Sequence, residues 1–181
     1  GPADQGEQHH RHAVGTLRGS YHGGVCANYL PVTQFDALLE HFGVERADDQ
    51  LPPEVYPGFV APFIRLVDGK RRAVEAGVFG MLPPWRRELQ YARQTYNSRS
   101  ETVAGLPSFR DAWRRGTRCV IPVWAVYEPR YNEDHTHERW RIEREDGRPL
   151  GIAGLYNEWV ENGKPVFSFT MLTVNADRHP F

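Results

Sequence analysis

Three short turn sequences divide much of the chain into segments typical of β-strands. The pairs Asp68-Gly69, Asp146-Gly147 and Asn162-Gly163 lie between stretches rich in β-branched and aromatic residues. Asn-Gly and Asp-Gly pairs favour the positive φ angles of tight turns, so the strands around them are expected to run mostly antiparallel. We expect strands at 59–67, 72–82, 138–145, 150–160 and 165–176.

The remaining patterns predict an α+β fold. Residues 117–128 are almost continuously apolar, which is typical of a buried central strand, and residues 26–30 indicate a further short strand. Apolar residues at helical spacing predict two short helices. The expected caps and stops are Thr33 and Gly43 for the first helix, and Ser108 and Gly116 for the second. The sum is a curved, largely antiparallel, barrel-like sheet with a few short helices.

Composition excludes several classes of protein. The 181 residues suffice for one domain with a sizeable core, and 40% hydrophobic residues with a net charge of −1 exclude an intrinsically disordered chain. No apolar run approaches the ~20 residues of a membrane-spanning helix, and no apolar signal segment is visible near the start. Two cysteines are too few to staple the domain, which favours the reducing cytoplasm of a bacterium.

The first residues differ from the rest of the chain. Residues 1–24 are rich in Gly, His and polar residues and have no periodicity. We interpret them as a disordered tail or as misassigned upstream sequence, and we expect 25–181 to form a single domain. No Gly-rich phosphate loop or paired-cysteine metal site is visible, so we expect neither a cofactor nor a metal.

Charges are unevenly placed. Residues 86–118 hold eight arginines against three acidic residues, whereas 40–54 hold five acidic residues against one arginine. A basic segment with aromatic residues suits a polyanion such as nucleic acid. A solvated helix face would give the same pattern, so charge alone leaves both interpretations open.

The two cysteines have different surroundings. Cys119 lies inside an apolar strand and fits a small buried hydrophobic residue. Cys26 has small and polar neighbours, and a nucleophilic thiol there would need partners from elsewhere in the chain. Candidate partners are Asn97, Glu128 and His179. Each has a plain alternative, namely a polar helix start at 97–102, a surface charge at a strand end and a histidine in a terminal loop.

Seven ordered blocks together resemble the SOS response-associated peptidase family, whose members shield abasic sites in single-stranded DNA. They run from Cys26 to Pro180 and are CANY (26–29), FGMLPPW (79–85), YNSRSET (96–102), PSFRDAW (107–113), RCVIPVWAVYE (118–128), GIAGLYNEW (151–159) and FTMLTVNADRHP (169–180).

The resemblance implies covalent chemistry. In this family the cysteine follows the initiator Met, which is removed, so one residue carries a free amine and a thiol. The amine condenses with the aldehyde of an open abasic site, and the thiol then closes a thiazolidine ring. By resemblance Cys26 is the nucleophile and Asn97 positions the sugar. Glu128 shuttles protons, and His179 assists opening of the sugar ring and reversal of the crosslink.

The resemblance also implies single-stranded DNA as the partner. Arg99 matches an arginine that binds backbone phosphate, and Trp85 matches an aromatic residue that stacks beside the lesion. Arg86 and Arg87 belong to the same basic stretch. Asn28 stands where the family commonly has arginine, so it offers a neutral hydrogen bond in place of a charged contact. We expect the protein to act as a monomer.

Both ends of the chain depart from the family pattern. Twenty-five residues precede Cys26 and would block its amine. A start at Val25, from a GUG codon read as Met, or autoproteolysis between Val25 and Cys26 would expose it. The chain stops at Phe181, just after His179, where family members usually continue, so we expect truncation.

The function predicted from these features is crosslinking of abasic sites in the DNA damage response, with lyase-like and autopeptidase activity as further expectations. Two alternatives stay open. One is a thiol peptidase that uses Cys26 and His179, and the other is a non-catalytic single-strand binder that uses residues 85–118.

Overall fold

The computed structural model describes residues 28–45, 51–132 and 136–175. Cys26 and His179 lie outside these ranges, as do Val25, the whole predicted tail at 1–24 and the last residues of the chain. None of the helices within the ranges has the length and apolar content needed to cross a bilayer. In chain order the elements are β1 (Asn28–Pro31), α1 (Phe35–Phe42), β2 (Val60–Val67), β3 (Arg71–Phe79), η1 (Leu89–Tyr91), α2 (Ala92–Thr95), β4 (Asn97–Arg99), α3 (Arg110–Arg115), β5 (Arg118–Tyr131), β6 (His137–Glu143), β7 (Leu150–Glu161) and β8 (Lys164–Thr173).

Five of the described strands close into a mixed barrel. β5 pairs antiparallel with β2 and with β7. β2 pairs antiparallel with β3, and β7 with β8. The parallel pair β3–β8 completes the ring. The predicted α+β class with a curved, largely antiparallel, barrel-like sheet is therefore confirmed.

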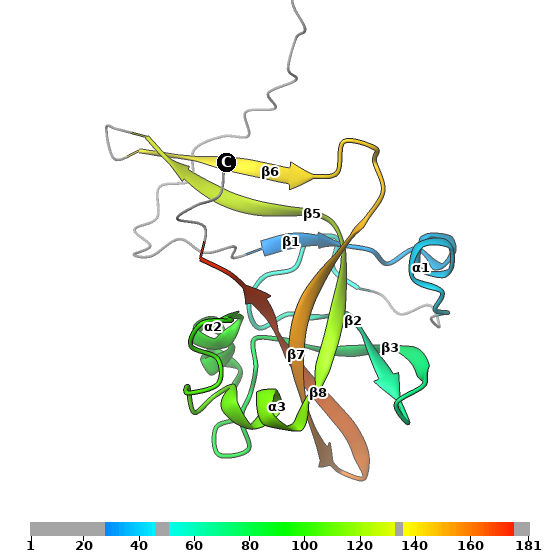
Figure 1. Cartoon of the computed structure of the whole chain (residues 1–181), viewed down its shortest axis with the longest axis vertical. Coiled ribbons are helices and arrows are strands. Elements are labelled where there is room, and N and C mark those ends of the chain that lie inside the picture. Colours follow the sequence, from blue (N-terminus) through cyan, green and yellow to red (C-terminus); the bar gives the residue numbers. More distant parts are fainter. Residues whose placement is uncertain (1–27, 46–50, 133–135, 176–181) are drawn as a thin grey trace, which may run out of the picture.

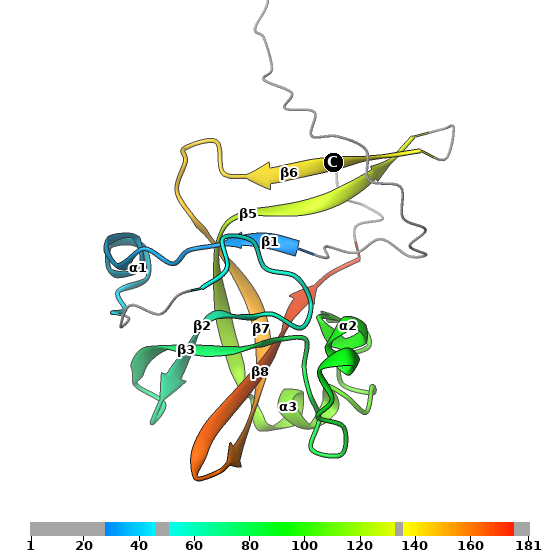
Figure 2. The same ribbon diagram turned by 180° about the vertical axis from the view of Figure 1, so that it is seen from behind.

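The second half of β5 leaves the barrel as a three-stranded ribbon. β1 pairs with one edge of β5 and β6 with the other, and both pairings are antiparallel. Figure 1 shows this ribbon above the barrel, with α2 and α3 near β8 and the lower end of β5. The view from behind shows the start of β1, the end of β8 and α2 towards the same side of the molecule (Figure 2).

Aromatic rings fill the barrel. Tyr29, Phe63, Phe79 and Phe169 are fully buried there. Phe79 stacks on Phe169 with ring centroids 5.6 Å apart, and Tyr29 meets the edge of Phe79 at 5.1 Å. Burial of each such side chain contributes about 2 kcal/mol to folding, so these aromatic side chains contribute much of the stability of the barrel.

Two predicted hairpins are confirmed by the backbone of their turns. Asp68 and Gly69 both have positive φ, as do Asn162 and Gly163. This is the pattern of a type I′ turn, which matches the twist of the flanking strands. The strands on either side pair as β2–β3 and β7–β8.

The strands around Asp146-Gly147 do not form such a hairpin. β6 and β7 lie end to end along the same edge of β5 and do not pair with each other. A single long strand accommodates both, so the turn only redirects the chain. The sheet is largely but not wholly antiparallel, because β8 runs parallel to β3 and to β4.

The predicted helix ends are confirmed, but the caps predicted at the helix starts are wrong. Gly43 and Gly116 end α1 and α3 in the left-handed conformation. Thr33 does not cap α1, because the residue before the helix is Gln34 and it makes no side-chain cap. Ser108 does not cap α3 either. Its hydroxyl lies 2.7 Å from the hydroxyl of Tyr91 and joins α3 to the η1–α2 segment.

Gly80 sets how closely α2 approaches the end of β3. Its φ is +117°, and a Cβ at this position would lie 2.4 Å from the Cβ and the carbonyl oxygen of Ala92. The backbone N–H of Gly80 donates to Phe169 O at 2.8 Å, which pins the turn to β8. Only glycine combines this backbone angle with this contact.

We expect Gly80→Ala to lower the free energy of unfolding by about 3 kcal/mol or more, because backbone strain and a clash add together. Gly69→Ala is the matched control, since Gly69 also has positive φ but has no atom near the added Cβ. The control should cost about 1 kcal/mol. Urea unfolding followed by tryptophan fluorescence measures both, and equal losses would contradict this account.

Candidate functional site

Asn97 and Arg99 lie on β4, a short strand held against β8. Thr173 Oγ1 donates to Asn97 Oδ1 at 2.8 Å, and the fully buried Ser98 donates to Met171 O at 3.0 Å. The alternative of a polar helix start at 97–102 is therefore wrong. Because the amide oxygen of Asn97 accepts from Thr173, its NH2 group turns away from that residue. Arg99 is exposed at the end of the strand.

A carboxylate joins the segment after β4 to the segment after β8. The backbone N–H of Asn175 donates to Glu101 Oε1 at 2.7 Å. This hydrogen bond is the main reason that the pKa of Glu101 is lower than usual. The contact holds the chain beside β4 at Asn175, the last described residue before the segment that carries His179.

Glu128 lies on the β5–β6 ribbon and is half-buried. The strand was predicted to end at Glu128, but it continues through Pro129 to Tyr131. Glu128 lies opposite Trp140 of β6, two residues beyond Val126, which belongs to the barrel core. Alternate residues of a strand share a face, so Glu128 lies on the face that continues from the core. The alternative for Glu128 was a surface charge at a strand end, and a half-buried position inside the strand differs from it.

Asn28 begins β1 beside the same part of β5. It pairs with Tyr127, the neighbour of Glu128, and its side chain is only 8% exposed. Its Nδ2 donates to Glu54 Oε1. The β1–β5 register therefore sets the backbone of Asn28 opposite the residue next to Glu128, while the alternation of the strands places the side chains of Asn28 and Glu128 on opposite faces of the ribbon. A contact between Asn28 and DNA stays a prediction.

Trp85 is presented by the loop that follows β3. It is 57% exposed, whereas the two arginines after it are laid over aromatic rings. The guanidinium carbon of Arg86 is 4.7 Å from the centroid of Tyr91, and that of Arg87 is 5.3 Å from the centroid of Trp159. Cation–π contacts of this kind restrict the arginine side chains while leaving the tryptophan accessible.

Buried polar side chains clamp the start of this loop, and they are not among the site residues predicted from the sequence. Ser168 Oγ accepts from Leu82 N at 2.9 Å, and Asn157 Nδ2 donates to Leu82 O at 3.2 Å. Arg115 Nη2 donates in turn to Asn157 Oδ1 at 3.1 Å. The available signal was the presence of Asn157 and Ser168 at inward positions of otherwise apolar strands, since a buried polar group needs a partner.

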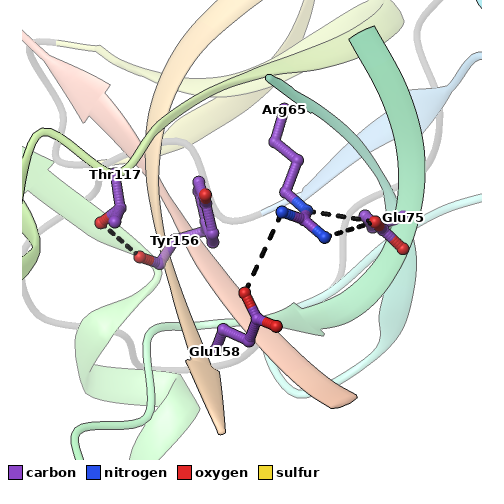
Figure 3. Close-up of polar contacts among 5 residues, drawn as sticks. All are labelled: Arg65, Glu75, Thr117, Tyr156 and Glu158. Carbon is purple, nitrogen blue, oxygen red and sulfur yellow. Dashed lines mark hydrogen bonds and ion pairs between the residues drawn. The ribbon is translucent and has the colours of Figure 1, made fainter. Parts of the chain in front are cut away.

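An ion-pair cluster lies between β2, β3 and β7. Arg65 bonds Glu75 at 2.8 Å and lies 4.0 Å from Glu158, beside the ring of Tyr156 (Figure 3). Thr117 Oγ1 donates to Tyr156 O at 2.7 Å and anchors β7 next to it. None of the predicted site residues takes part in these described contacts, which join strands of the barrel.

The described residues hold no group of three metal-ligating side chains. Cys119 is buried in the barrel core, as predicted, and burial raises the pKa of its thiol. A buried neutral thiol is a poor nucleophile and a poor ligand. Of the two cysteines in the sequence, Cys26 therefore remains the candidate nucleophile.

Comparison with known proteins gives consistent results. The sequence model of the SOS response associated peptidase (SRAP) family matches residues 25–180. Abasic site processing protein YoqW of Bacillus subtilis (strain 168) is 29% identical over 161 residues, which cover 84% of this chain and 70% of that protein. Abasic site processing protein HMCES of Gallus gallus is 25% identical over 135 residues, or 60% of this chain and 39% of that protein.

Solved structures share the fold. A protein from Bordetella bronchiseptica matches with a TM-score of 0.75 and 35% identity, covering 86% of this chain and 75% of that one. A protein from Bacteroides thetaiotaomicron matches with a TM-score of 0.66 and 22% identity, covering 83% of this chain and 68% of that one, and shows the fold alone.

The raised pKa of Cys119 predicts that a thiol reagent will not modify it in the folded protein. In a Cys26→Ser variant at pH 8, we expect no labelling before unfolding and one equivalent after unfolding in guanidinium chloride. The thiol stays protonated at this pH because burial disfavours the thiolate. Rapid labelling of the native variant, counted by mass spectrometry, would contradict this description of the core.

Proposed function

The chain belongs to the SOS response associated peptidase family, and on that premise we propose that it crosslinks covalently to abasic sites in single-stranded DNA through Cys26. Its relatives in Bacillus subtilis and Gallus gallus are named abasic site processing proteins. The observation that carries the proposal is the register that sets Asn28 beside the segment of β5 containing Glu128. Cys26 precedes Asn28 by only two residues in the sequence.

The proposed reaction joins one amine, one thiol and one aldehyde with loss of one water. The α-amine of Cys26 adds to the aldehyde carbon of the ring-opened abasic sugar, and loss of water gives a Schiff base. The thiol then adds across the carbon–nitrogen double bond and closes a thiazolidine ring. The active form must therefore begin at Cys26, because an internal cysteine has no free amine and would form only a reversible thiohemiacetal.

We assign a separate role in this reaction to each of the site residues. Glu128 is half-buried and would transfer protons to and from the amine and the sugar oxygen. The NH2 group of Asn97, which faces away from Thr173, would hold the sugar. Arg99 and Trp85 are exposed and would contact phosphate and base, with Arg86 and Arg87 beside them. His179 would assist opening of the sugar ring.

The test is incubation of protein that begins at Cys26 with a single-stranded oligonucleotide carrying one abasic site, followed by denaturing electrophoresis. We expect a heat-stable shifted band that Cys26→Ser abolishes and Cys119→Ser leaves intact. The full 181-residue chain, in which residues precede Cys26, should give no such band unless those residues are first removed. An oligonucleotide with a tetrahydrofuran in place of the abasic sugar lacks the aldehyde and should give none.

Other results would favour the alternative functions. Salt-sensitive binding without a stable band would indicate a non-catalytic single-strand binder. Cleavage of casein without DNA would indicate a thiol peptidase. Mass spectrometry of protein from the native locus provides a separate check, because active protein that retains residues before Cys26 would contradict the thiazolidine.

Arg99→Ala should weaken binding to the tetrahydrofuran oligonucleotide and flatten its dependence on salt. One phosphate contact on a single strand contributes a slope of about 0.7 in log K against log salt, so the slope should fall by that amount. Arg71→Ala, which removes an exposed arginine at the β2–β3 turn, should leave the slope unchanged. Fluorescence anisotropy at several salt concentrations measures both variants. Equal slopes for Arg99→Ala and the parent chain would remove Arg99 from the interface.

A further inference from the structure

A carboxylate network ties the start of β1 to two other segments of the chain. Asn28 Nδ2 and Arg139 Nη2 both donate to Glu54 Oε1. The hydroxyl of Tyr56 donates to the same oxygen at 3.0 Å. Desolvation and this hydrogen bond raise the pKa of Tyr56 above its ordinary value, so the hydroxyl stays a donor. The Pro-rich loop, β1 and β6 therefore meet at a single carboxylate.

The network crosses β5 along one face of the ribbon. Tyr127 of β5 pairs with Asn28. The guanidinium carbon of Arg139 lies 3.5 Å from the centroid of the Tyr127 ring. Arg139 thus reaches from β6 over the ring of Tyr127 to Glu54. Together with Asn28 on β1, these side chains link β1, β5, β6 and the Pro-rich loop.

Backbone hydrogen bonds hold Glu54 in place beside β1. Tyr29 N donates to Val55 O at 3.2 Å, and Val55 N donates to Tyr29 O at 2.9 Å. This bridge joins the residues that follow Asn28 and Glu54. The approach of the two side chains is consequently fixed by the main chain on both sides and by two prolines before Glu54.

An ionised carboxylate accepts hydrogen bonds but cannot donate them. Glu54 therefore forces the amide of Asn28 to turn its NH2 group towards the loop and its carbonyl oxygen away. Glu54 is 27% exposed, so its charge is partly desolvated and is compensated by Arg139. A neutral or absent side chain at position 54 would release both the amide orientation and the start of β1.

We propose that Glu54 is a positioning residue for the crosslinking reaction, which holds Asn28 and β1 so that Cys26, two residues earlier, is presented to the abasic sugar. The inference rests on the proposed function. Glu54 itself touches no reacting atom. It acts through Asn28, so its effect should disappear when the Asn28 contact is removed and return when the contact is rebuilt.

The first experiment compares Glu54→Ala with Glu75→Ala in the crosslinking form of the protein. Glu75 also bonds an arginine and is 26% exposed, but it lies in the Arg65 cluster between barrel strands. We expect Glu54→Ala to slow single-turnover crosslinking at saturating DNA about tenfold, as misplacement of a reacting group does. Affinity for the tetrahydrofuran oligonucleotide should stay within twofold of the parent chain. Glu75→Ala should leave the crosslinking rate unchanged.

A reciprocal exchange separates positioning from general stability. Asn28→Asp opposes two carboxylates and should slow crosslinking at least as much as Glu54→Ala. Adding Glu54→Gln to Asn28→Asp reverses donor and acceptor, rebuilds the hydrogen bond and should recover most of the lost rate. Thermal unfolding shows that each variant is folded at the assay temperature, and the exchange pair decides the matter if Glu54→Ala does not fold.

Three results would overturn the inference. One is equal crosslinking by Glu54→Ala and Glu75→Ala, and another is failure of the exchange to recover the rate in a folded double variant. Both leave the proposed function standing, because the parent chain still forms the band. The third is a parent chain that forms no band, which overturns the proposed function and this inference together.

Discussion

The pairing of β5 along both of its edges is the constraint on which the rest of the structure depends. β7 and β6 follow one edge, and β2 and β1 follow the other. The first half of the strand closes the barrel around the aromatic core, and the second half leaves it as a ribbon. Glu128 lies in the ribbon half, so the strand that completes the core also carries the candidate acid. Loss of the β5–β7 or β5–β2 pairing would open the core and displace the site in one step.

Local patterns predicted what is decided locally. The hairpin turns at Asp68-Gly69 and Asn162-Gly163 and the helix ends at Gly43 and Gly116 depend on backbone angles that a few residues determine. The parallel pairing of β8 with β3 and β4 depends on strands far apart in the sequence, and no local periodicity records it. The same reason explains why β6 and β7 were not recognised as two segments along one edge of β5.

The candidate site was predictable from motifs more than from physical signals in the residues. Cys119 was correctly placed in the core because its strand is apolar, and this left Cys26 as the reactive candidate. The buried Asn157 and Ser168, which hold Leu82 before the Trp85 loop, were overlooked because each appears as a single polar residue in a strand. Their partner is a backbone group that only the folded chain brings near.

Glu54 shows how a partly desolvated charge is neutralised from another element. An arginine at position 28 would neutralise the neighbouring carboxylate by itself. An asparagine donates a hydrogen bond but no charge, so the partly desolvated Glu54 needs a cation from another element. Arg139 supplies it from β6, laid over the ring of Tyr127. The start of β1 is consequently held by β6 as well as by β5.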